Sequence, residues 1–82
     1  MKRNGQLEAL IVRTLAESES SYLSNDEIVK LIATDGAEHE RATVAHHVLL
    51  LEDSGFVKPH GTAWRLTASG HDLYESFMRV KG

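Results

Sequence analysis

Residues 43 to 74 read TVAHHVLLLEDSGFVKPHGTAWRLTASGHDLY, and they begin with an amphipathic helix. Val44 sets the direction of an apolar stripe on this helix. At about 100° per residue, Val48, Leu51 and His47 fall within about 60° of that direction. Gly55 favours the end of a helix, so we expect the helix to run from residue 37 or 40 to residue 54. Of the adjacent residues His46 and His47, His47 is therefore expected on the apolar side of the helix.

The rest of the same stretch predicts two short strands and another helix. FVK at 56 to 58 and AWRL at 63 to 66 are joined by PHGT at 59 to 62, whose proline and glycine are typical of turns. Thr67 can cap the helix that follows. Apolar residues form two neighbouring stripes along this helix, with Leu73, Phe77 and Val80 in one and Tyr74 and Met78 in the other.

Two helices are predicted ahead of this stretch. The first covers residues 5 to 18, with Asn4 as its N-cap. Its apolar residues recur at helical spacing, at Leu7, Leu10, Ile11 and Leu15. The second covers residues 25 to 34, where Ser24 and Glu27 have the spacing of a capping box.

Hydrophobic residues also mark the second helix. Leu23 and Ile28 have the spacing of a hydrophobic staple. We expect Ile28, Leu31 and Ile32 to face one way, toward the core. Gly36 stands where a helix commonly ends in the left-handed conformation.

The predicted order is helix, helix, helix, hairpin, helix, with a tight turn between the second and third helices. This is the order of a winged helix-turn-helix. We therefore expect one mainly α-helical domain over residues 1 to 82, with a small β-hairpin as its wing. One hydrophobic core should contain Leu10, Ile11, Ile28, Ile32, Val44, Val48, Leu51, Phe56, Trp64, Leu66, Leu73 and Phe77.

Two segments also resemble known families. VAHHVLLLEDSGFV is similar to the end of the recognition helix in many bacterial winged-helix regulators, which read roughly V-S-x-H-L-x-x-L-x-x-x-G-L-V. The matching positions are Val44, His47, Val48, Leu51, Gly55, Phe56 and Val57. WRLTASGHDLYESF resembles the closing L-T-x-x-G-H-x-x-L of a domain-of-unknown-function family of short phage and prophage winged-helix proteins. The resemblance covers residues 44 to 77 and implies a winged-helix regulator.

Composition and charge limit the other classes of protein. The 82 residues include no cysteine, which fits a reducing cytoplasm. Glu8 and Arg13 interrupt the apolar residues near the N-terminus, so we expect a soluble, unprocessed protein with no membrane partner. The formal net charge is −3, but residues 15 to 54 hold nine acidic and two basic residues, a charge of −7. The remaining positive charge lies toward the two ends of the chain, including Lys2 and Arg3.

The histidines do not have the spacing of metal ligands. His46 and His47 point about 100° apart on a helix, and His39 lies about two turns, roughly 10 Å, from His46. HER at 39 to 41 lacks the second histidine of a zinc-protease motif, because residue 43 is Thr. We expect His47 to be a partly buried packing residue, and we expect neither a metal nor a cofactor.

Catalysis is also not expected. The sequence has no G-x-S-x-G or S-x-x-K nucleophile motif, and so small a winged helix offers no deep cleft. We therefore expect a binding protein rather than an enzyme, and two kinds of partner are open.

The first hypothesis is binding to double-stranded DNA, as a transcription regulator of a phage, prophage or bacterium. The exposed side of the third helix would lie in the major groove, while the hairpin would contact the backbone or the minor groove. Residues nearest the base edges would be Arg41, Thr43, Ala45 and His46, and those nearest phosphates Lys58, His60 and Arg65.

The alternative is a protein-binding module on the same scaffold, such as an anti-CRISPR-like phage inhibitor of a host defence or another adaptor. The −7 segment favours it, because DNA readers normally neutralise phosphates with lysine and arginine. The partner would contact His39, Ala42, His46, Leu49 and Asp53. Leu49 packing against the chain's own first helix is the other reading of that residue.

Pairing of two copies is a further expectation. Tyr74 and Met78 lie beside the main stripe of the last helix, and Val12 lies outside that of the first. A symmetric dimer through the terminal helices would cover these residues.

Overall fold

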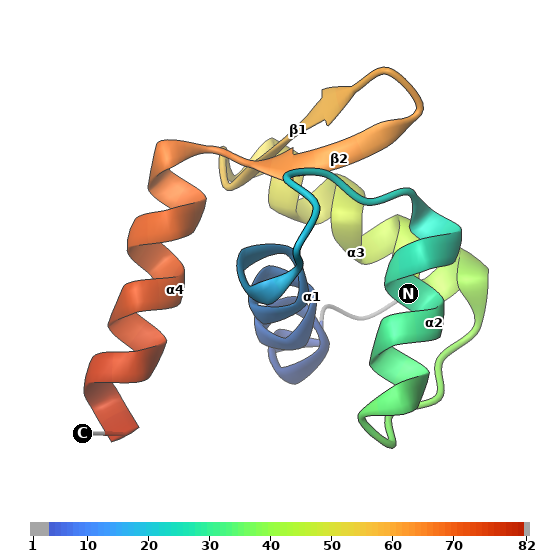
Figure 1. The fold of residues 1–82 in the computed structure, drawn as a ribbon, viewed down its shortest axis with the longest axis horizontal. Coiled ribbons are helices and arrows are strands. Elements are labelled where there is room, and N and C mark those ends of the chain that lie inside the picture. Colours follow the sequence, from blue (N-terminus) through green and yellow to red (C-terminus); the bar gives the residue numbers. More distant parts are fainter. Residues whose placement is uncertain (1–3, 82) are drawn as a thin grey trace.

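The computed structural model describes the backbone of residues 4 to 81 and the side chains of residues 4 to 79. The predicted places of Lys2 and Arg3, and that of the Val80 side chain in the last apolar stripe, lie outside this description. The elements follow in the predicted order: α1 Gly5–Glu17, α2 Asn25–Thr34, α3 Arg41–Asp53, β1 Val57–His60, β2 Ala63–Leu66 and α4 Ala68–Lys81 (Figure 1). The chain is a winged helix-turn-helix, mainly helical with a two-stranded antiparallel wing.

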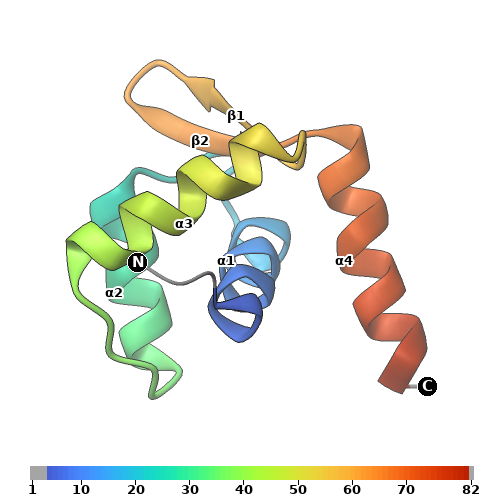
Figure 2. The same cartoon turned by 180° about the vertical axis from the view of Figure 1, so that it is seen from behind.

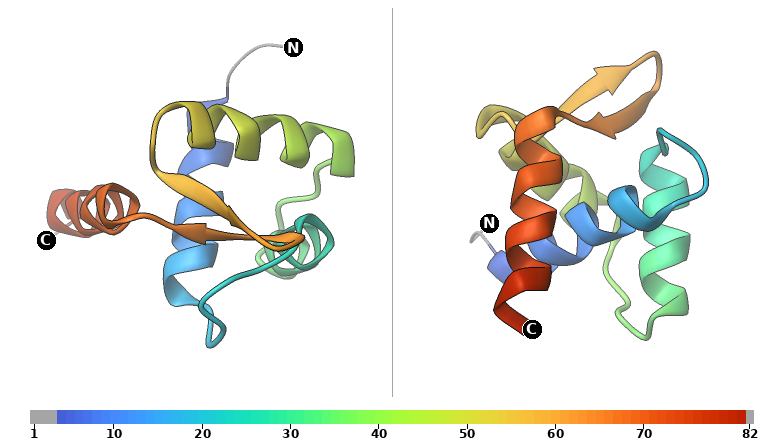
Figure 3. Two further views of the ribbon diagram at one scale, coloured as in Figure 1. Left: turned by 90° about the horizontal axis from the view of Figure 1, so that it is seen from above. Right: turned by 60° about the vertical axis from the view of Figure 1, so that its left-hand side comes forward.

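Helix α1 lies at the centre of the molecule. It separates α4 on one side from α2 and α3 on the other, and the hairpin covers one end of this arrangement (Figures 1 and 2). Viewed from above, the hairpin crosses over α1 with α3 beside it (Figure 3). The outer side of α3 is left uncovered (Figure 2).

The predicted core is largely confirmed. Seven of its residues are buried, namely Ile11, Ile28, Ile32, Val44, Val48, Leu51 and Leu66. Five others are partly buried and pack against them, namely Leu10, Phe56, Trp64, Leu73 and Phe77. The core also takes in residues outside the predicted set, namely Leu7, Val12, Leu15, Leu23 and Val57.

The side-chain directions predicted from periodicity are wrong at two residues. Leu31 was expected beside Ile28 and Ile32, yet its side chain is 42% exposed, because α2 packs along one narrow side only. Val12 was expected outside the core, yet it is 0% exposed. Since α1 contacts all three other helices, a wider arc of its surface is buried than one apolar stripe would need.

Side-chain caps begin the first two helices as predicted. The Asn4 side chain accepts a hydrogen bond from the N–H of Leu7 at 3.1 Å. Ser24 Oγ accepts from the Glu27 N–H at 3.2 Å, and the Ser24 N–H donates to Glu27 Oε1 at 2.9 Å. This backbone hydrogen bond from Ser24 lowers the pKa of Glu27, so the capping box is complete at neutral pH and is lost as the pH falls through that lowered pKa.

The hairpin turn is shorter than predicted. Strand β1 continues through Pro59 and His60, which pair with Trp64 and Ala63, so only residues 61 and 62 form the turn. Gly61 has a φ of +63°, as the first position of a tight hairpin turn requires. Proline is tolerated in this strand because β1 is the outer edge of the sheet.

The inner strand has a further partner that the sequence did not predict. Leu23 forms an isolated antiparallel bridge with Trp64, with N–H to O distances of 2.9 and 2.8 Å. The segment before α2 therefore pairs with the inner strand of the wing, one residue away from the pair that closes the turn.

The junction between the wing and α4 explains the L-T-x-x-G pattern. Thr67 Oγ1 donates to the Gly55 carbonyl at 2.6 Å and accepts from the Gly70 N–H at 3.1 Å, so it caps α4 as predicted. A Cβ atom at Gly70 would collide with the carbonyl of Phe56. Glycine at this position lets the first turn of α4 pack directly against the loop between α3 and β1.

We expect Leu51→Ala to lower the free energy of unfolding by about 2 to 5 kcal/mol, because it removes a fully buried side chain and leaves a cavity. Leu49→Ala is the matched control, since it makes the same change on the same helix at a side chain that is 50% exposed. Thermal melts measure both. A Leu51→Ala melting temperature within a degree of the parent would contradict the core assignment.

Candidate nucleic-acid interface

His47 is a structural residue of the core. Its side chain is 1% exposed, more deeply buried than predicted. Its Nδ1 lies 2.7 Å from the carbonyl oxygen of Thr43, and its Nε2 accepts a hydrogen bond from the N–H of Asn4 at 3.0 Å. Both ring nitrogens are therefore engaged, which leaves neither to hold a metal or to transfer a proton. Within residues 4 to 79, no group of three or more histidine, aspartate or glutamate side chains could hold a metal ion.

His46 occupies the border of the exposed side of α3. It is half-buried, and its ring meets that of His47 edge to face at a centroid distance of 5.4 Å. His39, before α3, is also half-buried. Because only part of each ring is exposed, each can form a hydrogen bond to a partner only at the protein surface.

The outer side of α3 presents small and apolar residues. Of the eight predicted contact positions on and just before this helix, Arg41, Ala42, Leu49 and Asp53 are exposed, while His39, Thr43, Ala45 and His46 are half-buried. Leu49 is 50% exposed, so it does not pack fully against α1. Because Ala42 and Ala45 have small side chains, a partner can closely approach the backbone of the first two turns of α3.

Arg41 is the one positive charge on this side of α3, and it is paired. Its Nε lies 2.7 Å from Oδ1 of Asp26, near the start of α2. Both side chains are largely exposed, at 70% and 63%, so the pair adds little to stability and can be rearranged. Next to it, Oδ1 of Asn25 is shielded from solvent and has no hydrogen-bond partner in the described part of the chain.

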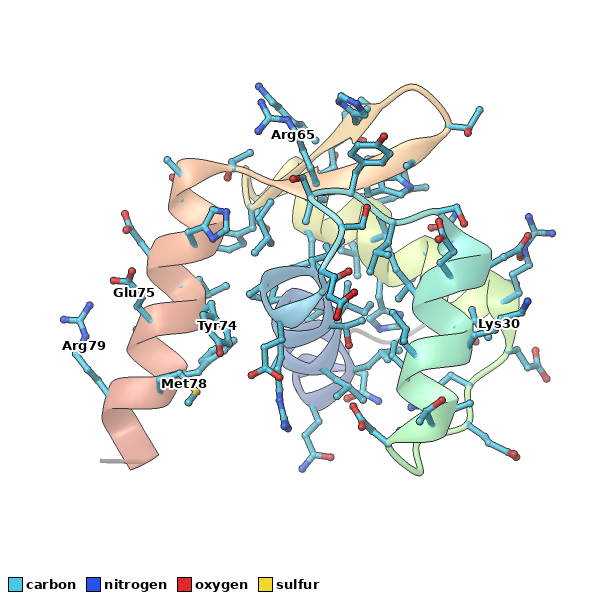
Figure 4. All side chains as sticks on the ribbon, in the orientation of Figure 1. Lys30, Arg65, Tyr74, Glu75, Met78 and Arg79 are labelled. Carbon is cyan, nitrogen blue, oxygen red and sulfur yellow. The ribbon has the colours of Figure 1, made fainter. Side chains whose placement is uncertain are left out.

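The wing gathers the other predicted cations. Lys58 and Arg65 are directly opposite each other across the two strands, and His60 is two residues along on the same side. Arg65 projects from the hairpin away from the helices (Figure 4). Among residues 4 to 79 neither Lys58 nor Arg65 takes part in an ion pair.

Tyr22 joins this surface, although no local sequence pattern predicts its position there. Its ring stacks on that of His60, with centroids 4.3 Å apart and an interplanar angle of 29°. Tyr22 is 45% exposed and precedes the bridge between Leu23 and Trp64. The wing surface is therefore Tyr22, Lys58, His60 and Arg65, two cations beside a stacked aromatic pair.

A separate apolar groove lies between α1 and α4. Its volume is about 510 Å³, and its lining residues are Gln6, Ala9, Leu10, Arg13, Glu17, Tyr74, Phe77 and Met78. Tyr74 and Met78 point toward α1 from α4, while Glu75 and Arg79 point the other way (Figure 4). The Tyr74 hydroxyl donates to Glu17 Oε2 at 2.8 Å, and this hydrogen bond raises the pKa of Tyr74.

Comparison with known proteins finds no matching protein family, no matching curated protein and no matching solved structure. The resemblance to phage and prophage winged-helix proteins therefore rests only on the sequence segments that carry it. No helix in residues 4 to 81 is long and apolar enough to cross a membrane.

We expect His47→Phe to lower the free energy of unfolding by about 1 to 3 kcal/mol, because the Asn4 N–H and the Thr43 carbonyl lose their side-chain partner. His46→Phe makes the same change next door, at a ring with no hydrogen bond to lose among the described residues, and should alter stability much less. Urea denaturation measures both variants. Equal losses would show that the hydrogen bonds of His47 carry no special weight.

Dimerisation through the terminal helices remains a prediction, but its set of contact residues changes. Val12 is buried and takes no part, whereas Met78 is 50% exposed beside the groove. Light scattering should report twice the 9.1 kDa chain mass for the parent. Met78→Asp should restore the single mass, and Ser76→Asp, about 200° around α4, should not. A parent of 9.1 kDa at micromolar concentration would refute pairing.

Proposed function

We propose that this chain binds double-stranded DNA, with α3 in the major groove and the wing on the adjacent backbone, as a cytoplasmic transcription regulator of a phage or bacterium. The helix-turn-helix arrangement and the uncovered side of α3 support the first contact (Figure 2). The cations of the wing surface support the second.

One observation carries the proposal, namely the cross-strand pair of Lys58 and Arg65. Like charges directly opposite each other destabilise a hairpin. In residues 4 to 79 no carboxylate pairs with either side chain to offset this repulsion. An anionic partner would offset it, and a phosphate backbone next to α3 supplies anions in a row.

The exposed side of α3 is suited to contact with base edges. Ala42 and Ala45 are small enough for the helix to enter a groove closely, and their methyl groups can contact thymine methyls. Arg41 and His46 add hydrogen-bonding groups on either side of them. Thr43 contributes less, because its carbonyl is held by His47 and its side chain is half-buried.

A protein partner is the second candidate, and Leu49 is the observation that favours it. This leucine is half exposed on a side of α3 that also holds Asp53, and both lie within the −7 segment. Desolvating an exposed leucine favours a protein surface over DNA phosphates. On this reading His39, Ala42, His46, Leu49 and Asp53 form the contact, as in an anti-CRISPR-like inhibitor.

Duplexes selected from a random pool and measured at several salt concentrations test the two candidates. If α3 reads DNA, Arg41→Ala should weaken binding by about 1 to 3 kcal/mol and relax sequence preference. Lys58→Ala should weaken all sequences alike and lower the salt slope by about one unit. Lys30→Ala is the charge-matched control, since Lys30 lies on the outer flank of α2 (Figure 4).

The outcomes separate the candidates. A protein site predicts no salt-sensitive DNA binding by the parent, together with loss of partner capture in Leu49→Asp but not in Lys58→Ala. Specific DNA binding that survives the joint loss of Arg41 and Lys58 would show that both residue assignments are wrong.

A further inference from the structure

The ion pair between Asp26 and Arg41 links the two helices of the helix-turn-helix. Asp26 is the second residue of α2, and Arg41 is the first residue of α3. Oδ1 of Asp26 lies 2.7 Å from Nε of Arg41, and no other ion pair in residues 4 to 79 joins these two helices. Because an exposed pair adds little to stability, its effect is mainly on where the guanidinium points.

The atom that Asp26 holds decides what the guanidinium can still do. A guanidinium carries five N–H donors, of which Nε supplies one. The two terminal nitrogens of Arg41 supply the other four, and none of them donates a hydrogen bond within the described residues. A terminal pair of N–H groups in one plane matches two acceptors side by side, and in the major groove guanine offers O6 and N7 in that arrangement.

The surroundings of Arg41 leave space for a base edge. An open hollow of about 400 Å³ is lined by Asn25, Arg41, Ala42 and Ala45. Two of these four residues are alanines, so no long side chain of α3 competes for the hollow. Arg41 itself is 70% exposed, which leaves its terminal nitrogens accessible.

We propose that Asp26 is a positioning residue that holds Arg41 for guanine, so that this chain selects a G·C pair where the first turn of α3 meets the duplex. The inference rests on the proposed DNA binding and adds the base that is read and the residue that makes the reading selective. The opposite role is that Asp26 withholds Arg41 and repels phosphates. The two roles predict opposite effects of removing the carboxylate.

The experiment compares base preference in the parent, Asp26→Asn, Arg41→Ala and the double variant, using duplexes selected from a random pool. The parent should prefer one G·C pair at a defined position. Asp26→Asn and Arg41→Ala should each reduce discrimination at that pair about tenfold and leave the other positions unchanged. In the double variant, loss of Asp26 should add nothing, because Asp26 acts through Arg41.

Two controls separate positioning from charge and from folding. Glu38→Gln makes the same charge change at an exposed side chain just before α3, and should raise overall affinity slightly while keeping discrimination. Asp26→Ser keeps a residue that suits the first turn of a helix and should behave like Asp26→Asn. Thermal melts of all variants should lie close to that of the parent, since residues 26 and 41 are both largely exposed, with a small loss in the Asp26 variants from removal of a first-turn carboxylate.

Three results would overturn the inference. If Asp26→Asn keeps the preference and binds its site more tightly than Glu38→Gln does, Asp26 withholds Arg41. If the parent binds DNA without preferring G·C at any position, Arg41 reads no guanine while the proposed function stands. If the parent shows no salt-sensitive binding to any duplex, the proposed function fails, and this inference fails with it.

Discussion

The imidazole of His47 fixes how the third helix lies on the first. One ring nitrogen bonds to the carbonyl of Thr43 within α3, and the other accepts from the N–H of Asn4 at the start of α1. The bond to Asn4 joins the two helices, and because the His47 side chain is buried its loss would leave a ring nitrogen unpaired, which favours one rotational setting of α3. Ala42, Ala45 and Leu49 lie about 140° to 160° from His47 around the helix, which places them outward. A hydrogen bond of a buried residue, His47, therefore helps to determine which residues of α3 face outward.

Local patterns predicted the elements well because their causes are local. The Asn4 cap, the capping box of Ser24 and Glu27, and the Thr67 cap depend on side chains within three residues of their partners. The direction of a residue on a helix depends instead on how many neighbours the helix has. Periodicity therefore failed for Val12, on the central helix, and for Leu31, on a helix covered along one side.

Contacts between distant segments could not be read from the sequence. The stack of Tyr22 on His60 and the pairing of Asp26 with Arg41 join residues whose separation carries no periodic signal. The extra length of β1 was missed for a different reason. Proline and glycine both favour turns, and only the position of Pro59 on an outer strand edge makes it a strand residue here. The predicted hairpin places Lys58 and Arg65 on neighbouring strands, but its four-residue turn would set Lys58 opposite Ala63. The observed register, with Lys58 opposite Arg65 and His60 within β1, depends on the two-residue turn.

The acidic charge of the helix-turn-helix is partly structural. Asp26 and Glu27 lie in the first turn of α2, where carboxylates favour the positive end of the helix dipole, and Glu27 completes a cap. These charges stabilise the fold but also repel a duplex that comes within roughly a Debye length, about 8 Å at physiological salt. The wing cations act within that distance. Non-specific attraction to DNA should thus be weak, and occupancy should depend on contacts made at close range.

The contacts that hold the wing in place determine which close-range contacts the wing itself can make. Its inner strand is held by the bridge between Leu23 and Trp64, and its outer strand by the stacking of Tyr22 on His60, so the segment before α2 supports the wing near its turn. With a turn of only two residues the wing cannot follow the duplex far. It can orient α3 on the backbone but can read little sequence itself. Under the proposed DNA binding, any sequence preference would come from the few polar groups on α3, and among these the guanidinium of Arg41 is the one that Asp26 pairs with in the described structure.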